Sequence, residues 1–257
     1  MSRPTDCFTD AVQDYVKYRP SYPREVLQFL IKECGLQKNH VVADIGSGTG
    51  LFSKLLLDDD NTVYGVEPNQ AMREAAEDYL KNYPHFHNIN GTAEATSLPG
   101  QGMDFVTAGT AFHWFDIQKT KIEFRRILKH SGWVILVWNV RDKEHSALLH
   151  DYEELLLTYG KNYKDSRAQE FDQTAVAEFF SPNEMKIAAF NNQQQFDWEG
   201  FKGRLLSTSY SLRPGAAQYE EMLCALKSIF DRHQKDGSVE FLYSTKLYYG
   251  RIHEHIE

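Results

Sequence analysis

A glycine-rich turn at residues 44–50 constrains this chain more than any other stretch of its 257 residues. The apolar run Val41–Ile45 predicts a short strand that leads into three alternating glycines, and we expect a helix to begin at Leu51. Alternating glycines leave one side of a turn without side chains and permit backbone angles that are closed to other residues. A ligand can therefore approach the main chain closely, beside the free N–H groups that begin a helix.

Asp44, two residues before the first glycine, helps to distinguish between the classes of ligand that such a turn can bind. The dinucleotide fingerprint G-x-G-x-x-G needs a small residue one position after Gly50, where this chain has Leu51. A carboxylate in the turn repels a pyrophosphate and attracts an ammonium group. These features favour S-adenosylmethionine over NAD. An NAD-dependent oxidoreductase and a turn without any ligand remain the alternatives.

A second acidic residue, Glu67, ends the next predicted strand, which covers residues 62–67. Nucleoside-binding α/β folds place a carboxylate about 20 residues after the glycines. Its two oxygens match the two hydroxyls of a ribose. Glu67 is therefore the predicted ribose ligand, and Pro68 and Met72 are expected to pack against an adenine ring.

The stretch 110–116 follows the predicted fourth strand, 103–109, and is rich in aromatic residues. Ligands in open α/β sheets bind beyond the carboxyl ends of the strands. His113 and Trp114 are therefore candidate catalytic residues, with His113 as a possible general base, and Gly109 at the strand end is a candidate cofactor contact. In the alternative interpretation the aromatic side chains cap the core and His113 begins a helix.

Strands and helices alternate through the first half of the chain. Predicted strands at 88–94 and 133–138 flank a helix at 117–128, and the strands are mostly apolar. This pattern predicts a parallel sheet with helices on both faces. We interpret residues 1–257 as one domain, with an N-terminal helical cap at 1–35 and a helical insertion at 141–183. Tyr15 and Arg19 of the cap are expected to face the ligand pocket. Further elements are predicted as strands at 186–196 and 239–250 and as helices beginning at 198 and 219.

The composition excludes several classes of protein. The formal net charge of −8, without a marked Lys/Arg cluster, argues against nucleic-acid binding. The three cysteines lie far apart, which argues against disulfides and zinc and suits a cytoplasmic setting. No apolar run is long enough to span a bilayer, so no membrane partner is expected. We take the histidine pairs as surface residues and expect no metal, and we expect a monomer or a homodimer.

Four stretches in order resemble the class I S-adenosylmethionine-dependent methyltransferases, in a type 11-like form. They are Asp44-Ile45-Gly46-Ser47-Gly48-Thr49-Gly50, Glu67, Gly91-Thr92-Ala93-Glu94 with Leu98-Pro99, and Met103-Asp104-Phe105-Val106 with His113-Trp114-Phe115. The resemblance implies a Rossmann-like seven-stranded sheet, order 3-2-1-4-5-7-6, with strand seven antiparallel. The start of the chain and residues 198–210 are loosely similar to the carboxyl methyltransferases typified by trans-aconitate methyltransferase.

The same resemblance implies roles for individual residues. Gly46, Ser47 and Gly48 would face the methionine and ribose part of S-adenosylmethionine, and Asp44 would lie near its amino group. Ala93 would offer its backbone N–H to the adenine. Many relatives have Asp before this alanine, where this chain has Thr92, so that Glu94 is the nearest substitute.

The resulting expectation is a methyltransferase that acts on a small molecule, with a carboxylate oxygen as one candidate acceptor. A carboxylate is nucleophilic at neutral pH and needs no base, whereas a phenol, amine or carbon acid needs one. The alternative is a non-catalytic or regulatory protein that keeps the cofactor-binding fold.

Overall fold

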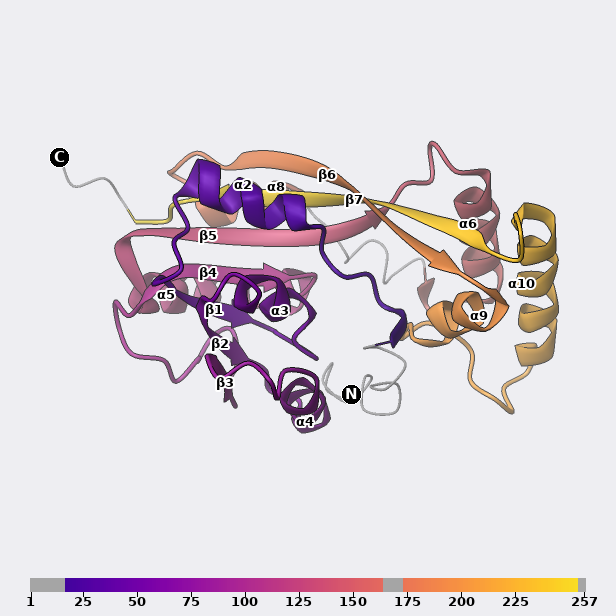
Figure 1. Cartoon of the computed structure of the whole chain (residues 1–257), viewed down its shortest axis with the longest axis horizontal. Coiled ribbons are helices and arrows are strands. Elements are labelled where there is room, and N and C mark those ends of the chain that lie inside the picture. Colours follow the sequence, from indigo (N-terminus) through magenta and orange to yellow (C-terminus); the bar gives the residue numbers. More distant parts are fainter. Residues whose placement is uncertain (1–16, 164–172, 254–257) are drawn as a thin grey trace.

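The computed structural model describes residues 17–163 and 173–253 and contains a seven-stranded sheet in the order β3-β2-β1-β4-β5-β7-β6 (Figure 1). This is the predicted order, and β7 is antiparallel to both β5 and β6, as the resemblance implied. The strands are β1 (Val41–Ile45), β2 (Thr62–Val66), β3 (Phe86–Ile89), β4 (Met103–Gly109), β5 (Leu128–Arg141), β6 (Lys186–Phe196) and β7 (Val239–Gly250).

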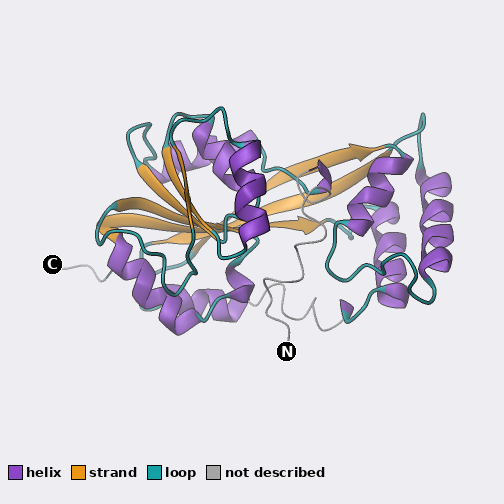
Figure 2. Ribbon diagram, turned by 90° about the horizontal axis from the view of Figure 1, so that it is seen from below, coloured by secondary structure: helices purple, strands orange, loops and turns teal. Residues whose placement is uncertain are grey.

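Helices cover both faces of the sheet, because successive side chains of each strand point to opposite faces. On one face, Val42 and Phe105 pack with α2 (Arg24–Cys34) and α3 (Leu51–Leu57). On the other face, Ala43 and Val106 pack with α5 (Ile117–Ile127) and α8 (Gln173–Phe180). Figure 2 shows the twisted strands between these helices. Helix α4 (Gln70–Tyr79) follows β2 and contacts β3.

A third core lies away from the first two. Strands β5, β6 and β7 run beyond the rest of the sheet towards α6 (Ala147–Tyr159), α9 (Trp198–Leu206) and α10 (Tyr219–His233) (Figure 1). We call these three helices, with the adjoining ends of β6 and β7, the helical lobe. Its core contains Tyr152, Phe201, Phe230 and Phe241, which are almost fully buried.

Most element bounds agree with the sequence-based predictions, and three differ. Strand β3 begins earlier than predicted, and Thr92 to Ala95 form a tight turn whose two end residues exchange backbone hydrogen bonds. A Cβ on Gly91, just before this turn, would lie 2.9 Å from the Thr96 carbonyl oxygen. Strand β5 is longer than its apolar run, because β7 pairs with it as far as Arg141. The predicted insertion 141–183 contains α6 in the helical lobe and α8 against the sheet, so its two helices pack in different places.

Among the described residues, no helix has the length and apolar character needed to cross a bilayer.

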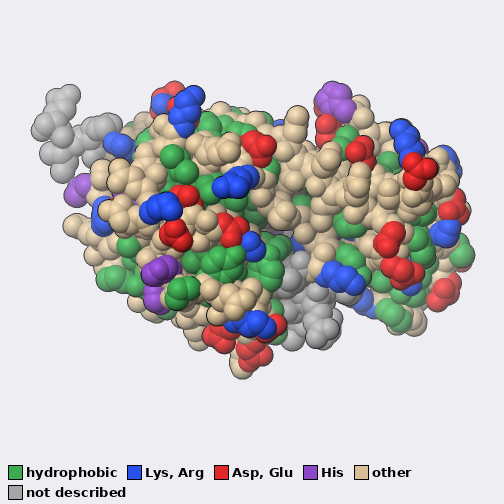
Figure 3. All heavy atoms as spheres, in the orientation of Figure 1, with side chains coloured by type: hydrophobic (Ala, Val, Ile, Leu, Met, Phe, Trp, Pro, Cys, Tyr) green, Lys and Arg blue, Asp and Glu red, His purple; other side chains and the backbone are tan. Residues whose placement is uncertain are grey.

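On the face shown in Figure 3, Lys and Arg side chains are interspersed with Asp and Glu.

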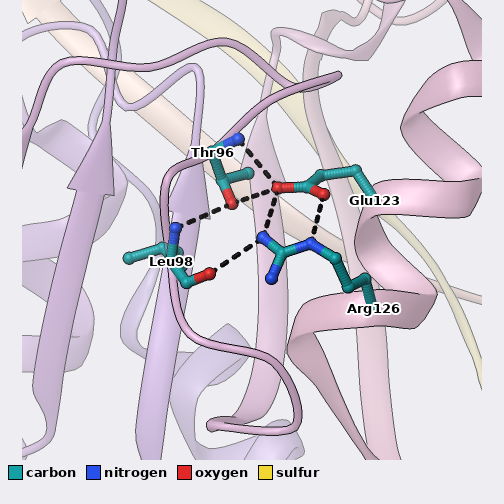
Figure 4. A network of polar contacts seen from close by, with 4 residues as sticks. All are labelled: Thr96, Leu98, Glu123 and Arg126. Carbon is teal, nitrogen blue, oxygen red and sulfur yellow. Dashed lines mark hydrogen bonds and ion pairs between the residues drawn. The ribbon is translucent and has the colours of Figure 1, made fainter.

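A buried polar network fixes the loop between β3 and β4 to helix α5 (Figure 4). Glu123 Oε1 accepts hydrogen bonds from the Thr96 backbone N–H at 2.8 Å and from the Thr96 hydroxyl at 2.5 Å. Arg126 pairs with Glu123 and donates to the Leu98 carbonyl at 2.8 Å. The network therefore attaches the loop that carries Ala93 and Glu94 to helix α5.

We expect Glu123→Ala to lower the free energy of unfolding by about 2–4 kcal/mol, because it leaves two buried Thr96 donors and Arg126 without their acceptor. Urea denaturation followed by circular dichroism measures this change. Glu74→Ala, at an exposed site on α4, is the control and should change stability by less than about 0.5 kcal/mol. Equal effects of the two substitutions would contradict the structural role of the network.

Candidate functional site

A cavity of about 460 Å³ opens at the carboxyl edge of the parallel strands, above β1, β2 and β4. This volume lies in the range of small-molecule sites. The predicted residues that line it are Asp44, Gly46, Ser47, Gly48, Glu67, Pro68, Met72, Ala93, Glu94, Gly109 and Trp114. The fold therefore brings together residues that are up to 70 positions apart in the chain.

The glycine turn forms the floor of this cavity, and each of its glycines has a positive φ: 65° at Gly46, 57° at Gly48 and 83° at Gly50. A Cβ on Gly46 would lie 2.6 Å from the Ala111 Cβ, so a side chain would collide with the opposite wall. A Cβ on Gly48 would meet nothing within 4 Å. The main chain at Gly48 is thus open on the side where a side chain would otherwise project.

Glu67 follows β2 and has both of its carboxylate oxygens fixed. Oε2 accepts from the Gly48 N–H at 3.0 Å, and Oε1 accepts from the Asn69 N–H at 2.9 Å. Burial raises the pKa of Glu67, while these two hydrogen bonds act in the opposite direction. A carboxylate oxygen has two lone pairs, so each can accept a further hydrogen bond from a ligand hydroxyl.

Asp44 is fully buried and joins three elements at the cavity floor. Its oxygens accept from the Ser53 hydroxyl of α3 at 2.6 Å and from the Thr107 hydroxyl of β4 at 2.9 Å. Burial raises the pKa of Asp44 to about 6, although the two hydroxyls favour the ionised form. A cationic group near Asp44 would restore the carboxylate to its charged state.

Two hydroxyls of the turn have no partner among the described residues. Ser47 Oγ and Thr49 Oγ1 are buried and make no hydrogen bond there. Both residues line the cavity. Buried hydroxyls are normally hydrogen-bonded, so these two are available to a polar ligand.

The charge of the cavity wall is negative. Asp44, Glu67 and Glu94 line the cavity, and no Lys, Arg or His of the described residues does so. Glu94 also accepts from the Asp116 N–H at 2.9 Å, which caps the region before α5. Such a wall suits a ligand that carries positive charge and hydroxyl groups, and it disfavours a pyrophosphate.

Aromatic side chains enclose the side of the cavity next to β4. Tyr22, Phe52, Trp114 and Phe115 line it, and the Trp114 side chain is 47% exposed at the rim. The Tyr22 hydroxyl lies 3.3 Å from Thr110 Oγ1. Thr110 has a φ of 55°, which is rare for a β-branched residue and marks a strained position.

Two of the predicted site residues, His113 and Arg19, are not among the residues that line the cavity. The His113 ring packs at 5.0 Å from that of Trp114 in a short 3-10 helix, Phe112–Trp114. Burial lowers the pKa of His113 to about 4, so the ring is neutral at pH 7. Arg19 is directed to the Ser207 carbonyl oxygen, at 3.2 Å. Tyr15 and the helix expected around it lie outside the described residues.

Several lining residues were not predicted from the sequence: Tyr22, Thr49, Leu51, Phe52, Asn69, Thr110 and Ala111. Asn69 carries a usable signal, because it caps α4 through a hydrogen bond from the Met72 N–H at 3.1 Å. Thr110 carries none, since nothing in its local sequence indicates a positive φ. Tyr22 lines the cavity and has its hydroxyl next to Thr110, which is 88 residues away in the sequence.

Comparisons with known proteins agree with this geometry. The family described as a methyltransferase domain matches residues 43–136. An uncharacterised methyltransferase of Mycobacterium tuberculosis is 33% identical over 136 residues, 53% of each chain. One of Schizosaccharomyces pombe is 28% identical over 136 residues, 52% of this chain and 53% of its own. The chain thus spans about half the length of the curated relatives it matches.

Solved structures show the same fold at low identity. A candidate type II methyltransferase from Anaeromyxobacter dehalogenans has a TM-score of 0.67 and 23% identity, over 93% of this chain and 100% of its own. The phosphoethanolamine N-methyltransferase 2 of Haemonchus contortus has a TM-score of 0.55 and 13% identity, over 96% of this chain and 58% of its own. That structure contains phosphomonomethylethanolamine and S-adenosylhomocysteine.

We expect Asp44 to impose a pH dependence on stability. Because its folded-state pKa is raised, folded protein binds this proton more tightly than unfolded protein, and that contribution is lost as pH rises from about 4 to about 6. Between pH 4 and pH 7, the unfolding free energy of Asp44→Asn should therefore gain about 2–3 kcal/mol relative to the wild type. Urea titrations of both proteins over this range measure the difference. Parallel pH profiles would refute a raised pKa.

Proposed function

We propose that this chain, a member of the class I S-adenosylmethionine-dependent methyltransferases, transfers a methyl group from S-adenosylmethionine to a small-molecule acceptor. The observation that carries this proposal is the acid-lined cavity over the glycine turn, with its two unpartnered hydroxyls. When bound, S-adenosylmethionine supplies a methyl group already activated on a sulfonium, so the protein has to position an acceptor and exclude water.

Four groups of this chain would hold the cofactor. The Glu67 oxygens, fixed by the Gly48 and Asn69 N–H groups, would accept from the ribose hydroxyls. Asp44 would attract the ammonium group of the methionine part, while the Ser47 and Thr49 hydroxyls would bond its polar atoms. Pro68, Met72 and Ala93, which line the same cavity, would contact the adenine.

The acceptor would enter beside Tyr22, Phe52, Trp114 and Phe115, the aromatic residues on the β4 side of the cavity. These side chains would shield the reacting atoms from water. A carboxylate oxygen is our candidate for the methylated atom, because it needs no base and no His or Lys of the described residues lines the cavity.

The open cavity supports an enzyme over a protein that binds the cofactor without catalysis. A non-catalytic relative has no need of space beside the methyl donor, whereas the cavity of about 460 Å³ that would hold the cofactor here also extends to the aromatic side chains next to β4. Radiometric screening of small acids, phenols and amines with a methyl-labelled donor tests the proposal. A protein that binds S-adenosylmethionine but methylates no acceptor in such a screen would favour the binding function.

We expect Glu67→Ala to weaken S-adenosylmethionine binding by about 100-fold, because it removes a charged acceptor of two hydroxyls and loosens Gly48 and Asn69. Isothermal titration calorimetry measures the dissociation constant. Glu77→Ala, at an exposed site on α4, should bind like the wild type. Unchanged affinity in Glu67→Ala would remove the ribose assignment.

We expect His113→Phe to retain turnover within about threefold, because the ring lies outside the cavity wall and its buried Nδ1 has no hydrogen-bond partner. Initial rates with the labelled donor, at saturating acceptor, measure the effect. A general base contributes about 100-fold or more. A loss of that size, without a fall in melting temperature, would instead make His113 the base.

A further inference from the structure

The helical lobe contains a buried cluster of positive charge that the cofactor site does not use. Arg204 of α9 is 3% exposed. Arg204 and Arg141, the last residue of β5, both interact electrostatically with Tyr152 and Tyr210. Arg204 Nε donates to the Tyr243 hydroxyl at 3.0 Å, and Tyr243 pairs with Arg141 in the β5–β7 ladder. The two guanidinium groups thus share one site in the lobe.

The cations of this cluster outnumber its carboxylates among the described residues. Arg141 pairs with Glu153 at 3.2 Å, and Lys143 pairs with the same carboxylate at 3.1 Å. No ion pair is found for Arg204 in the described part of the chain, where its guanidinium contacts the Tyr243 hydroxyl and the face of the Phe241 ring. A buried arginine stays charged and is costly without a negative partner.

Two donors of the cluster have no partner in residues 17–163 and 173–253. Arg204 Nη1 is buried and makes no hydrogen bond within these ranges, and the same holds for the Tyr152 hydroxyl. Burial raises the pKa of Tyr152 and the Arg204 charge acts in the opposite direction, so the hydroxyl is neutral and lies within the field of Arg204. A carboxylate between these groups would accept from both and would neutralise the arginine.

The cluster lies beyond the same carboxyl edge of the sheet at which the cofactor cavity opens. Gly109 lines the cavity and pairs with Val137 of β5, and Arg141 follows four residues later on the same strand. At roughly 3.3 Å per residue, Arg141 lies about 13 Å beyond the sheet edge at Gly109. A small molecule of moderate length spans this distance.

The segment 18–22 connects the two sites directly. At one end, Tyr18 packs on α9 where a Cβ on Gly203 would collide with its ring, and Arg19 Nη2 donates to the Ser207 carbonyl at 3.2 Å. At the other end, Tyr22 lines the cofactor cavity. In Figure 1 this part of the chain runs from α2 towards α9. An acceptor that reaches both sites lies under it.

We propose that Arg204 and the Tyr152 hydroxyl bind a carboxylate group of the methyl acceptor, remote from the atom that is methylated. The acceptor class is therefore an acid whose anionic group anchors it in the helical lobe while its other end reaches the cofactor cavity. This inference rests on the proposed function, because it names the acceptor of that same site.

Thermal unfolding in a series of linear dicarboxylates tests the anion site without knowledge of the acceptor. The probes are succinate, glutarate and adipate, each compared with its uncharged diamide at constant ionic strength. We expect at least one diacid, and none of the diamides, to raise the melting temperature of the wild type. The inference is overturned if no diacid does so.

Three variants locate the effect. Arg204→Met should abolish the diacid-dependent rise, and Tyr152→Phe should at least halve it. Arg213→Met, at an exposed arginine near the same lobe, should keep it. Without added acid, Tyr152→Phe should melt within about 3 °C of the wild type, because its hydroxyl makes no bond in the protein. A diacid-dependent rise that persists in Arg204→Met would refute the site.

Calorimetry with S-adenosylmethionine separates this inference from the proposed function. Arg204→Met should bind the cofactor as the wild type does, and with a carboxylated acceptor its KM should rise about tenfold or more while kcat changes less. A wild type that fails to bind S-adenosylmethionine defeats the proposed function. A wild type that binds it, with no diacid effect, defeats the anion site alone.

Discussion

The hydrogen bonds of Asp44 hold the cofactor side of the molecule together. One buried carboxylate ties the end of β1 to α3 through Ser53 and to β4 through Thr107. The glycine turn begins directly after this point. Its conformation is therefore fixed at its start by Asp44 and further along by Glu67, which accepts from the Gly48 N–H. The two acids that shape the turn also give the cavity its charge. Structure and ligand preference therefore depend on the same residues, and neither can be changed alone.

Charge is divided between the two halves of the molecule. The cavity over the parallel strands is lined by carboxylates, whereas the helical lobe buries Arg204 and leaves the side chain of the neighbouring Arg141 12% exposed. A positively charged methyl donor and an acidic acceptor would each be attracted to a different half, and their reacting ends would meet between them. With this division, a chain of net charge −8 would still be able to recognise an acid, as we propose, because Arg141 and Arg204 lie together in one site.

The sequence predicts the helices and strands well and the contacts between distant segments poorly, for physical reasons. Apolar strand patterns and the glycine turn are local signals, so β1, β4, α10 and β7 agree with their predicted bounds. Most predicted cofactor residues line one cavity because the carboxyl ends of parallel strands meet at one edge. Tyr22, Thr110 and the Arg204 cluster depend on contacts between distant segments, which leave no periodic trace. In the sequence, Arg141 and Arg204 look like ordinary surface charges, and only the packing of α6 and α9 with β7 places them together.

The long strands β5 and β7 fix the position of the helical lobe relative to the cavity. A loop between the cavity and the lobe would let the two sites move independently. Here the antiparallel ladder continues without a break from Val134 and Gly250 to Arg141 and Tyr243. Side chains alternate along such a ladder, so a slip of one residue between β5 and β7 would put Arg141 and Tyr243 on opposite faces. If the proposed anion site holds one end of the acceptor, strand register would fix its separation from the methyl donor, and the acceptor would be selected by its length as well as by its charge.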